Sequence, residues 1–422
     1  MVRNIIYSSL WTKVIPLISC ASLFFVWGRH DLPGFVLGLL AILLVASVLA
    51  AVQHAEVVAH RVGEPFGSLI LAIAVTIIEV GLILMLMTTG SGDNSELARD
   101  SVFAAVMITM NGIVGLSLFV SASKFHLARF NSEGAGSALG SVILLTGLTL
   151  VIPSFTSSAE EGEFSSSQLV FAAVASLAVY GMFIFTQTVR HRDFFLPPAP
   201  PKPKARKAQR EQEDTLLDRI DDALLDSYEA SSSVVAGDSP LTAARWVRRA
   251  EPARRPTRQR PRDTAHAAKP SVQTTVISLV LLLASLVAVV GLAKIETPAI
   301  ESVVDHFHLP KAVIGVVIAL VILLPESISA VKAALRDRTQ ISLNLGYGSA
   351  MASIGLTIPA MAIASIWLEE HLVLGLQPVH LVLFATSAVV SVLTVVPGRA
   401  KSLHGALHLI ICFAFIFLTV VP

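Results

Sequence analysis

Two glutamates, Glu79 and Glu326, lie deep inside long apolar segments of this sequence. A carboxylate in hydrocarbon costs at least about 3 kcal/mol unless it is protonated or paired with a cation. Burial favours the protonated form, and a bound cation reverses that preference. The same oxygen atoms can therefore hold a proton or a metal ion in turn, and this is the chemistry of proton–cation exchange.

An alternative interpretation is that each glutamate is protonated and hydrogen-bonds a neighbouring helix, as a purely structural contact. A single buried glutamate would leave that interpretation open. Two glutamates at matching positions in corresponding segments, "AVTIIEVG" and "ILLPESIS", favour exchange.

The side chains available as further ligands are oxygen donors, because neither glutamate segment nor the segment after it contains Cys or His. This composition argues against Zn²⁺ and Cu⁺. Ca²⁺ accepts several oxygens in flexible geometry and is balanced by two carboxylates, whereas Mg²⁺ resists dehydration. Na⁺ and K⁺ also take oxygen ligands and stay open as alternatives. The supporting ligands we expect are Thr76, Asn111, Ser349 and Ser353.

Two more residues near the glutamates have expected roles. Pro325 has no N–H to donate, so a helix break there would free the Val321 carbonyl as a cation ligand; the alternative is an ordinary kink satisfied by Ser327. Glu64 precedes Glu79 by about 22 Å of helix. We expect Glu64 at the cytoplasmic mouth of the pathway, where it attracts cations or simply begins a helix.

The composition is that of a membrane protein. Of 422 residues, 54% are hydrophobic and only 14% are charged, whereas a soluble domain carries about 25% charged residues. The net charge of +1 says nothing about a nucleic-acid partner; none is expected, and membrane lipid is the expected surrounding. The two cysteines form no disulfide framework or metal motif, so no bound cofactor is expected.

The apolar runs predict eleven transmembrane helices, each long enough to cross about 30 Å of hydrocarbon. They do not alternate as barrel strands do, so the fold class is an all-α polytopic membrane protein. The predicted spans are 11–28, 33–52, 66–89, 101–123, 137–155, 167–187, 273–293, 310–332, 341–367, 376–396 and 402–421.

The spans after the first one divide into two blocks of five, and each block carries its glutamate in its second span. Five is an odd number, so the second block inserts with inverted topology, a pattern typical of transporters whose site lies between the repeats. The domains we predict are a first transmembrane half (1–190), a cytoplasmic linker with an acidic amphipathic helix and an Arg-rich segment (191–272), and a second transmembrane half (273–422).

Basic loops alternate with acidic ones along the chain, and Lys/Arg-rich loops stay in the cytoplasm. The loops "SASKFHLARFN", "KAALRDRTQ" and "PGRAKSLHG" and the linker are basic, whereas "TSSAEEGEF" is acidic. The N-terminus and the linker are therefore expected in the cytoplasm. We expect a bacterial inner (plasma) membrane by default, and the sequence leaves the oligomeric state open.

The stretches "HRVGEPFGSLILAIAVTIIEVGLI" and "LLPESISAVKAALRDRTQISLNLGYGSAMASIGLTIP" resemble the two repeats of the calcium/cation antiporter superfamily, in particular its bacterial calcium/proton (ChaA-type, CAX-like) branch. The resemblance implies that Glu79 and Glu326 form the cation and proton site, with polar residues of the following helix beside them. Many calcium/proton exchangers have Gly-Asn-Ala shortly before each glutamate; here those positions read "VTII" and "ILLP", so Na⁺ and K⁺ stay open.

The sequence thus predicts a secondary transporter that exports a cation, Ca²⁺ first, in exchange for protons by alternating access. A monovalent Na⁺(K⁺)/H⁺ antiporter is the alternative on the same scaffold. An intramembrane enzyme is disfavoured, because the chain has no HExxH or G-x-S-x-G motif. A channel is distinguished from both by the absence of proton coupling.

Overall fold

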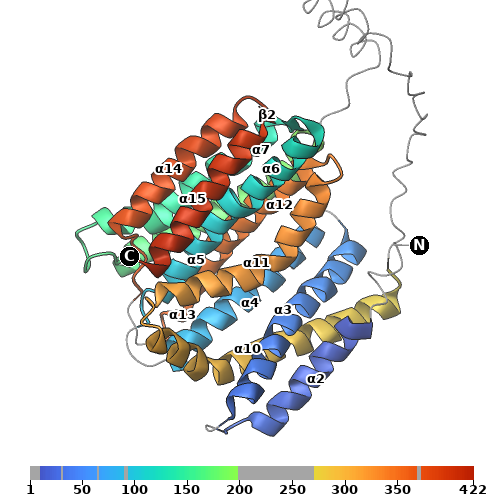
Figure 1. Cartoon of the computed structure of the whole chain (residues 1–422), viewed down its shortest axis with the longest axis vertical. Coiled ribbons are helices and arrows are strands. Elements are labelled where there is room, and N and C mark those ends of the chain that lie inside the picture. Colours follow the sequence, from blue (N-terminus) through green and yellow to red (C-terminus); the bar gives the residue numbers. More distant parts are fainter. Residues whose placement is uncertain (1–9, 30–31, 64–65, 90–93, 198–269, 368–371) are drawn as a thin grey trace, which may run out of the picture. The chain divides into compact units, whose positions relative to one another are not determined.

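The structure is a computed structural model that describes residues 10–29, 32–63, 66–89, 94–197, 270–367 and 372–422. These residues form long helices packed side by side, together with two strands of two residues each (Figure 1). Each of the eleven predicted spans coincides with a helix or with a run of consecutive helical segments. The predicted amphipathic helix and the Arg-rich segment of the linker, like Glu64, lie outside the described residues.

The first half contains an extra helix and five helical spans. They are α2 (Leu10–Val26), α3 (Gly34–Val62), α4 (Phe66–Thr89), α5 (Leu97–Met107) continued by η2 (Ile108–Ile113) and α6 (Val114–Phe125), α7 (Ser132–Thr146) continued by η3 (Gly147–Val151) and η4 (Ile152–Phe155), and α8 (Ser166–Phe185) continued by η5 (Thr186–Arg190) and followed by the short η6 (Arg192–Phe195).

The second half contains five spans in the same order. They are α10 (Val272–His306), α11 (Ala312–Ala334), α12 (Thr339–Ala352) continued by η8 (Ser353–Thr357) and α13 (Ile358–Ala364), α14 (Pro378–Val395) and α15 (Ser402–Val420).

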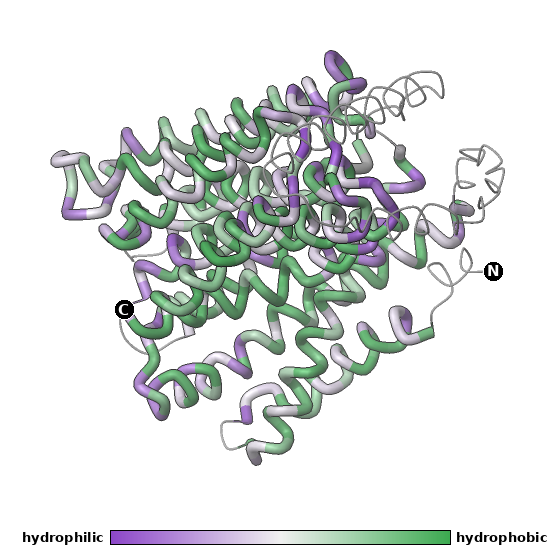
Figure 2. Tube along the Cα trace, turned by 45° about the horizontal axis from the view of Figure 1, so that its top comes forward, coloured by the Kyte–Doolittle hydropathy of each residue, from purple (hydrophilic) through white to green (hydrophobic). Residues whose placement is uncertain are grey.

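The helices have the length and composition of membrane spans. Ten of those in the described residues are long and apolar enough to cross a bilayer, and α2 is a shorter apolar helix of 17 residues. Figure 2 shows apolar residues running along the helices, with hydrophilic residues gathered mainly at helix ends and connections. The chain is therefore a polytopic α-helical membrane protein, as its composition predicts.

Two helices extend well beyond the predicted spans. α3 continues to Val62 and α10 to His306, where the predicted spans end at 52 and 293. The extensions contain charged residues, and these terminate an apolar run without terminating a helix, because Lys and Glu are good helix formers. Hydropathy therefore underestimates both helices, and α10 alone is 35 residues long.

The described residues of the two halves pack together as one compact unit. α3 of the first half packs along α10 of the second half, and α4 and α11 contact each other directly. α11 also lies against α5, and α4 lies against η8. The second span of each half therefore contacts helices of both halves, so a site between α4 and α11 belongs to both.

The chain connections at the two ends of the bundle also join the halves. We call the end at which α3 and α11 finish and α10 begins the linker end, and the other the opposite end. At the linker end, strand β1 (Ala128–Arg129) pairs antiparallel with β2 (Arg399–Ala400). At the opposite end, Glu163 bridges Val373, and Gly162 accepts hydrogen bonds from the backbone N–H groups of residues 374 and 375.

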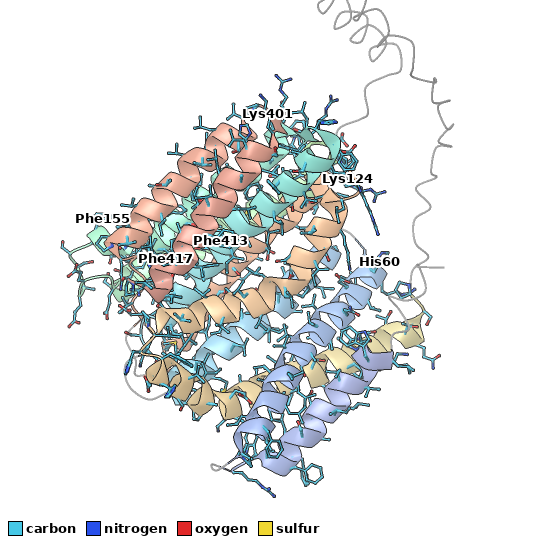
Figure 3. The ribbon with its side chains drawn as sticks, viewed as in Figure 1. His60, Lys124, Phe155, Lys401, Phe413 and Phe417 are labelled. Carbon is cyan, nitrogen blue, oxygen red and sulfur yellow. The ribbon has the colours of Figure 1, made fainter. Side chains whose placement is uncertain are left out.

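The outer surface of the bundle is apolar where lipid would contact it. Phe413 and Phe417 project outward from α15 (Figure 3) and are 67% and 62% exposed. Lys124 and Lys401 lie near one another at the linker end in the same view. Exposed aromatic side chains along one helix, with basic side chains at its end, match the surface that a bilayer requires.

α6 and α15 approach each other unusually closely at Gly405. A Cβ atom on Gly405 would lie 2.4 Å from the backbone N of Phe119 and 2.7 Å from the carbonyl oxygen of Gly115. Both neighbours are backbone atoms, which cannot rotate away as a side chain can. Gly405 is therefore required for the packing of α15 on the first half.

Replacing Gly405 with Ala is expected to lower the stability of the folded protein by about 1–3 kcal/mol, because the added methyl overpacks the contact. Thermal unfolding of the purified protein in detergent measures this. Gly140→Ala is the matched control, because a Cβ at Gly140 meets no atom within 4 Å. Equal melting temperatures for the two variants would contradict this account of the contact.

Candidate functional site

Glu79 lies near the middle of α4 and is 2% exposed. Its Oε2 atom accepts hydrogen bonds from the Ser353 hydroxyl at 2.9 Å and the Thr357 hydroxyl at 3.0 Å. Both hydroxyls belong to η8 of the second half. The carboxylate of one half is thus held by the other half, far from either end of its helix.

Glu326 occupies the matching place in α11, 14 residues after the helix begins and eight before it ends. Its Oε2 atom is buried and has no hydrogen-bond partner among the described residues. α3, which carries Glu56, also contacts α11. The two carboxylates of the candidate site therefore differ, because Glu79 is hydrogen-bonded by hydroxyls and Glu326 has an unsatisfied oxygen.

The helix break predicted at Pro325 is wrong. α11 is one α-helix from Ala312 to Ala334, and Pro325 lies inside it. Ser327 donates to the Leu323 carbonyl at 2.7 Å, as serines in helices commonly do. The free carbonyl expected at Val321 is accommodated within a continuous helix, so Pro325 does not open the backbone beside Glu326.

A π-helical segment lies instead in the span that follows each glutamate helix, and two more, η3 and η5, lie in the last two spans of the first half. The third span of the first half contains the π-helical segment η2, and the third span of the second half contains η8. Such π-bulges are frequent at functional sites, because they widen a helix and re-aim its side chains. A glycine lies in the middle of each of these apolar spans, Gly112 and Gly355, and is the signal for the irregularity that the sequence contains.

Three of the other predicted ligands, Ser353, Thr76 and Ser349, lie on α4 or on the span that contacts it. Ser353 hydrogen-bonds Glu79 directly. Thr76 is buried one turn before Glu79 on α4, and Ser349 is partly buried one turn before Ser353 on α12. Thr357, which also holds Glu79, was not predicted; its spacing of four residues from Ser353 puts the two hydroxyls on one helix face.

Asn111 is fully buried in a polar cluster between the two halves. Its side-chain amide donates to Ser387 at 2.8 Å, and its carbonyl oxygen lies 3.1 Å from His408 Nδ1. The other ring nitrogen of His408 lies 3.3 Å from the Thr394 hydroxyl. In this structure Asn111 therefore connects η2 to α14 and α15, and its role as a cation ligand stays a prediction.

Glu56 is a residue that sequence reasoning overlooked. It lies in the part of α3 that extends beyond the predicted span, and its side chain is exposed. Because the apolar run ends before it, hydropathy places Glu56 in a loop and away from any site. In the structure Glu56 instead belongs to α3, a helix that contacts α11.

The chemistry available at Glu79 follows from its neighbours. In the described residues no cluster of three or more His, Cys, Asp or Glu side chains could hold a metal ion. A cation at Glu79 would draw its remaining ligands from hydroxyl and carbonyl oxygens, which suit hard cations. Such a weakly charged site can release its ion, as transport requires.

Most of the chain matches a known family. Residues 31–189 and 277–421 match the family model described as sodium/calcium exchanger protein. The chain is 37% identical over 416 residues to the putative ionic transporter y4hA of Sinorhizobium fredii (strain NBRC 101917 / NGR234), covering 98% of this chain and 96% of the relative. It is 30% identical over 406 residues to the sodium-potassium/proton antiporter ChaA of Escherichia coli (strain K12), covering 96% and 94%.

Solved structures with the same fold include native YfkE, with a TM-score of 0.62 at 15% identity over 98% of this chain and 99% of that one. The H⁺/Ca²⁺ exchanger CAX gives a TM-score of 0.58 at 13% identity, over 96% and 93%. At these identities the likeness concerns the fold, including its two packed halves.

Removing the two hydroxyls that hold Glu79 is expected to weaken cation binding. A hydrogen bond to a charged group contributes about 1.5–3 kcal/mol, so Ser353→Ala or Thr357→Val should each raise the cation concentration for half-maximal flux about tenfold. Flux into sealed vesicles at graded cation concentrations measures this. Ser137→Ala and Thr386→Val are the controls, because those hydroxyls bond their own helix on the exposed surface; similar shifts in the controls would count against the site.

His408 is expected to act in stability, through its contacts with Asn111 and Thr394. His408→Ala should lower the melting temperature, because it removes the buried contacts with Asn111 and Thr394, and a typical hydrogen bond contributes about 0.5–1.5 kcal/mol. His404, one turn earlier, accepts from the Lys401 backbone N–H near the surface, so His404→Ala is the control. Unchanged stability of His408→Ala would show that the cluster does not support the fold.

Proposed function

The chain belongs to the sodium/calcium exchanger family, and we propose that it is a secondary transporter that exchanges a cation for protons, with Glu79 and Glu326 as the carboxylates that carry both. The observation that carries the proposal is the position of these glutamates. Each lies in the middle of the second span of one half, and those two spans, α4 and α11, contact each other.

Exchange follows from the competition between a proton and a cation for the same oxygens. A carboxylate inside the membrane is stable when it is protonated or paired with a cation, and costly when it is neither. Ion binding therefore releases protons, and protonation releases the ion. The contact between Glu79 and the hydroxyls of η8 couples this exchange to the relative position of the two halves.

Alternating access requires that the two halves move past each other around the site. Their assembly supports such movement, because each half brings its own glutamate, and Glu79 of the first half is hydrogen-bonded by hydroxyls of the second. The inverted order of spans gives the two halves corresponding parts that face opposite ends of the bundle. We propose that the site opens to one end at a time and exports the cation with the proton gradient.

Ca²⁺ is the cation that we propose first. Two carboxylates balance the charge of a divalent ion, and the hydroxyls beside Glu79 are hard oxygen ligands of the kind that Ca²⁺ accepts. The likeness of the fold to a protein named H⁺/Ca²⁺ exchanger is consistent with this choice. A specific observation favours the alternative of Na⁺ or K⁺ in exchange for H⁺, because a relative covering nearly the whole chain is a sodium-potassium/proton antiporter.

We propose a bacterial inner membrane as the location, with the linker end in the cytoplasm. Lys124 and Lys401 lie at that end, and Glu160, Glu161 and Glu163 follow the span that finishes at the opposite end. The rule that basic loops stay inside supports this orientation. Lipid is then the partner of the exposed apolar helix surfaces.

Replacing Glu79 or Glu326 with Gln is expected to abolish proton-coupled cation flux. Glutamine keeps the size of the side chain but cannot exchange a proton for an ion. Dissipation of a preset pH gradient in sealed vesicles by Ca²⁺, Na⁺ and K⁺, tested one at a time, measures the exchange. The ion that dissipates the gradient at the lowest concentration distinguishes Ca²⁺ from the monovalent alternative.

Glu133→Gln is the control, because the substitution makes the same chemical change at an exposed residue at the start of α7. It should exchange at the wild-type rate. Intact exchange of all three ions in both the Glu79 and the Glu326 variants would overturn the proposed mechanism, and cation flux that is independent of the pH gradient would indicate a channel.

A further inference from the structure

A large cavity lies at the opposite end of the bundle, between α3, α10 and α11. Its volume is about 1380 Å³, and liquid water occupies about 30 Å³ per molecule. Thr89 at the end of α4 and Val317 of α11 both contribute to its wall. The helices that carry the two site glutamates therefore also border this cavity, and each glutamate lies about 15 Å further along its helix.

One carboxylate, Glu296 of α10, contributes to the lining of this cavity. Its side chain is 3% exposed, and its Oε1 atom is buried without a hydrogen-bond partner among the described residues. An unsatisfied buried polar oxygen is costly, so a retained one calls for a functional reason. The proposed exchange at Glu79 and Glu326 does not by itself use this residue.

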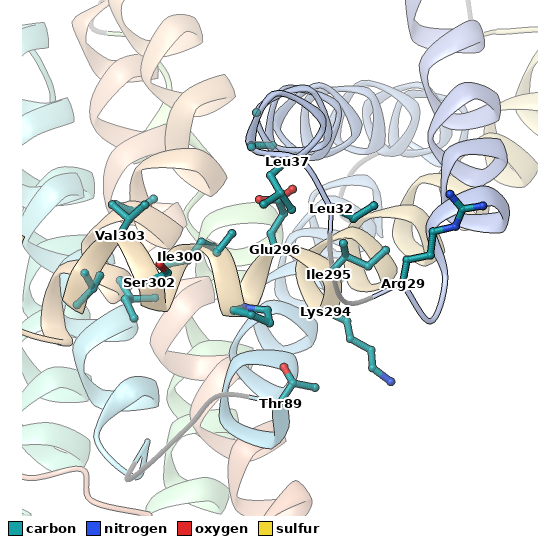
Figure 4. A pocket seen from close by; sticks show the side chains of 18 of the residues that line it. Arg29, Leu32, Leu37, Thr89, Lys294, Ile295, Glu296, Ile300, Ser302 and Val303 are labelled. Carbon is teal, nitrogen blue, oxygen red and sulfur yellow. The ribbon is translucent and has the colours of Figure 1, made fainter. Parts of the chain in front are cut away.

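The positive charges of the cavity do not neutralise Glu296. Figure 4 shows Glu296 directed toward Leu37 of α3, whereas Lys294 projects from the other side of α10. The ammonium group of Lys294 lies 5.2 Å from the centre of the Trp27 ring. Arg29 stands apart from Glu296 at the far side of the lining in the same view.

The charged side chains that line the cavity in the described residues are Arg29, Lys294 and Glu296, and α3, α4 and α11 contribute none. Glu301, Asp305 and His306 lie closer to the end of α10, and Lys311 precedes α11. A lone carboxylate without a second acidic ligand is a poor metal site and a good proton site, because a proton needs one oxygen and a hard cation needs several.

Ser302 provides a second polar group on the lining of the cavity, six residues after Glu296 on α10. The Ser302 hydroxyl and the Glu296 carboxylate can both bond water on the cavity side. Water with several polar partners can remain in such a site and carry protons.

The first span of the other half also carries a carboxylate. α3 carries Glu56 toward the linker end, and α10 carries Glu296 toward the opposite end. α3 and α10 are the first spans of the two inverted halves and pack along each other. Each half therefore supplies one carboxylate on its first span, at opposite ends of the bundle.

We propose that Glu296 is a proton-binding site that passes protons between the cavity and the Glu79–Glu326 pair from the end opposite the linker. The proposal rests on the proposed exchange of a cation for protons. In it the carboxylate accepts a proton from water in the cavity and releases it toward α4 and α11 when the site opens to that end. The cation itself is bound by the two deeper glutamates.

The test compares Glu296→Gln with Glu296→Asp. Asp305→Asn is the control, because it removes a carboxylate from an exposed position of the same helix, α10. Proton-coupled flux is measured in sealed vesicles of both orientations, with the pH varied on one side at a time. Glu296→Gln should exchange at least about tenfold more slowly, at the low end of what a positioned proton donor contributes. It should also lose the dependence on pH at the cavity side, while Glu296→Asp and Asp305→Asn keep it.

Cation affinity of the purified Glu296→Gln protein, measured by titration with Ca²⁺ and Na⁺, should stay within about twofold of wild type, which also shows that the variant folds. Wild-type flux and pH dependence in Glu296→Gln would overturn the relay, as expected if a lipid chain fills the cavity and excludes water. Loss of cation binding in this variant would overturn it too, because Glu296 would then belong to the fold or the cation site. A wild-type protein without proton-coupled flux would contradict the proposed function itself.

Discussion

The constraint on which this molecule depends is the cost of a carboxylate far from water. Glu79 is acceptable in the middle of α4 because two hydroxyls of the other half donate to it. That solution requires α4 to pack against η8, and it therefore requires the two halves to form one unit. The fold can be understood as the scaffold that brings hard oxygen donors from one half to the charged residue of the other.

Much of this architecture follows from the sequence, because a bilayer restricts the choice of structure. Long apolar runs must be helices, since lipid offers no partner for a free backbone group. The eleven spans and the two glutamates could be predicted for that reason. The charged extensions of α3 and α10 could not be predicted in this way. Hydropathy shows where an apolar run ends, but it does not show where the backbone hydrogen bonds of the helix end. Glu56 and Glu296 both lie in such extensions and were overlooked together.

The partners of the site residues were predicted less completely, because they depend on how the halves pack. Ser353 was identified from its position after Glu326 in the chain, yet it binds Glu79, the glutamate of the other half. Asn111, expected as a ligand on the same grounds, contacts His408 and Ser387 in the last two spans, and its role as a cation ligand stays a prediction. Proline was the obvious signal for an irregular backbone, but α11 passes through Pro325 as a helix while the third span of each half widens into a π-helical turn.

The π-helical segment η8 has a consequence for how relatives of this chain should be aligned. A π-bulge adds one residue to a helix, and one residue corresponds to about 100° of rotation. The part of the span after Thr357 therefore presents a different side from the one that an uninterrupted helix would present. An alignment of this chain with a relative that needs a gap of one residue in this span would show that different side chains face α4 in the two proteins. Sequence comparison across these helices should be made on either side of the bulge separately, because the numbering alone does not preserve the face.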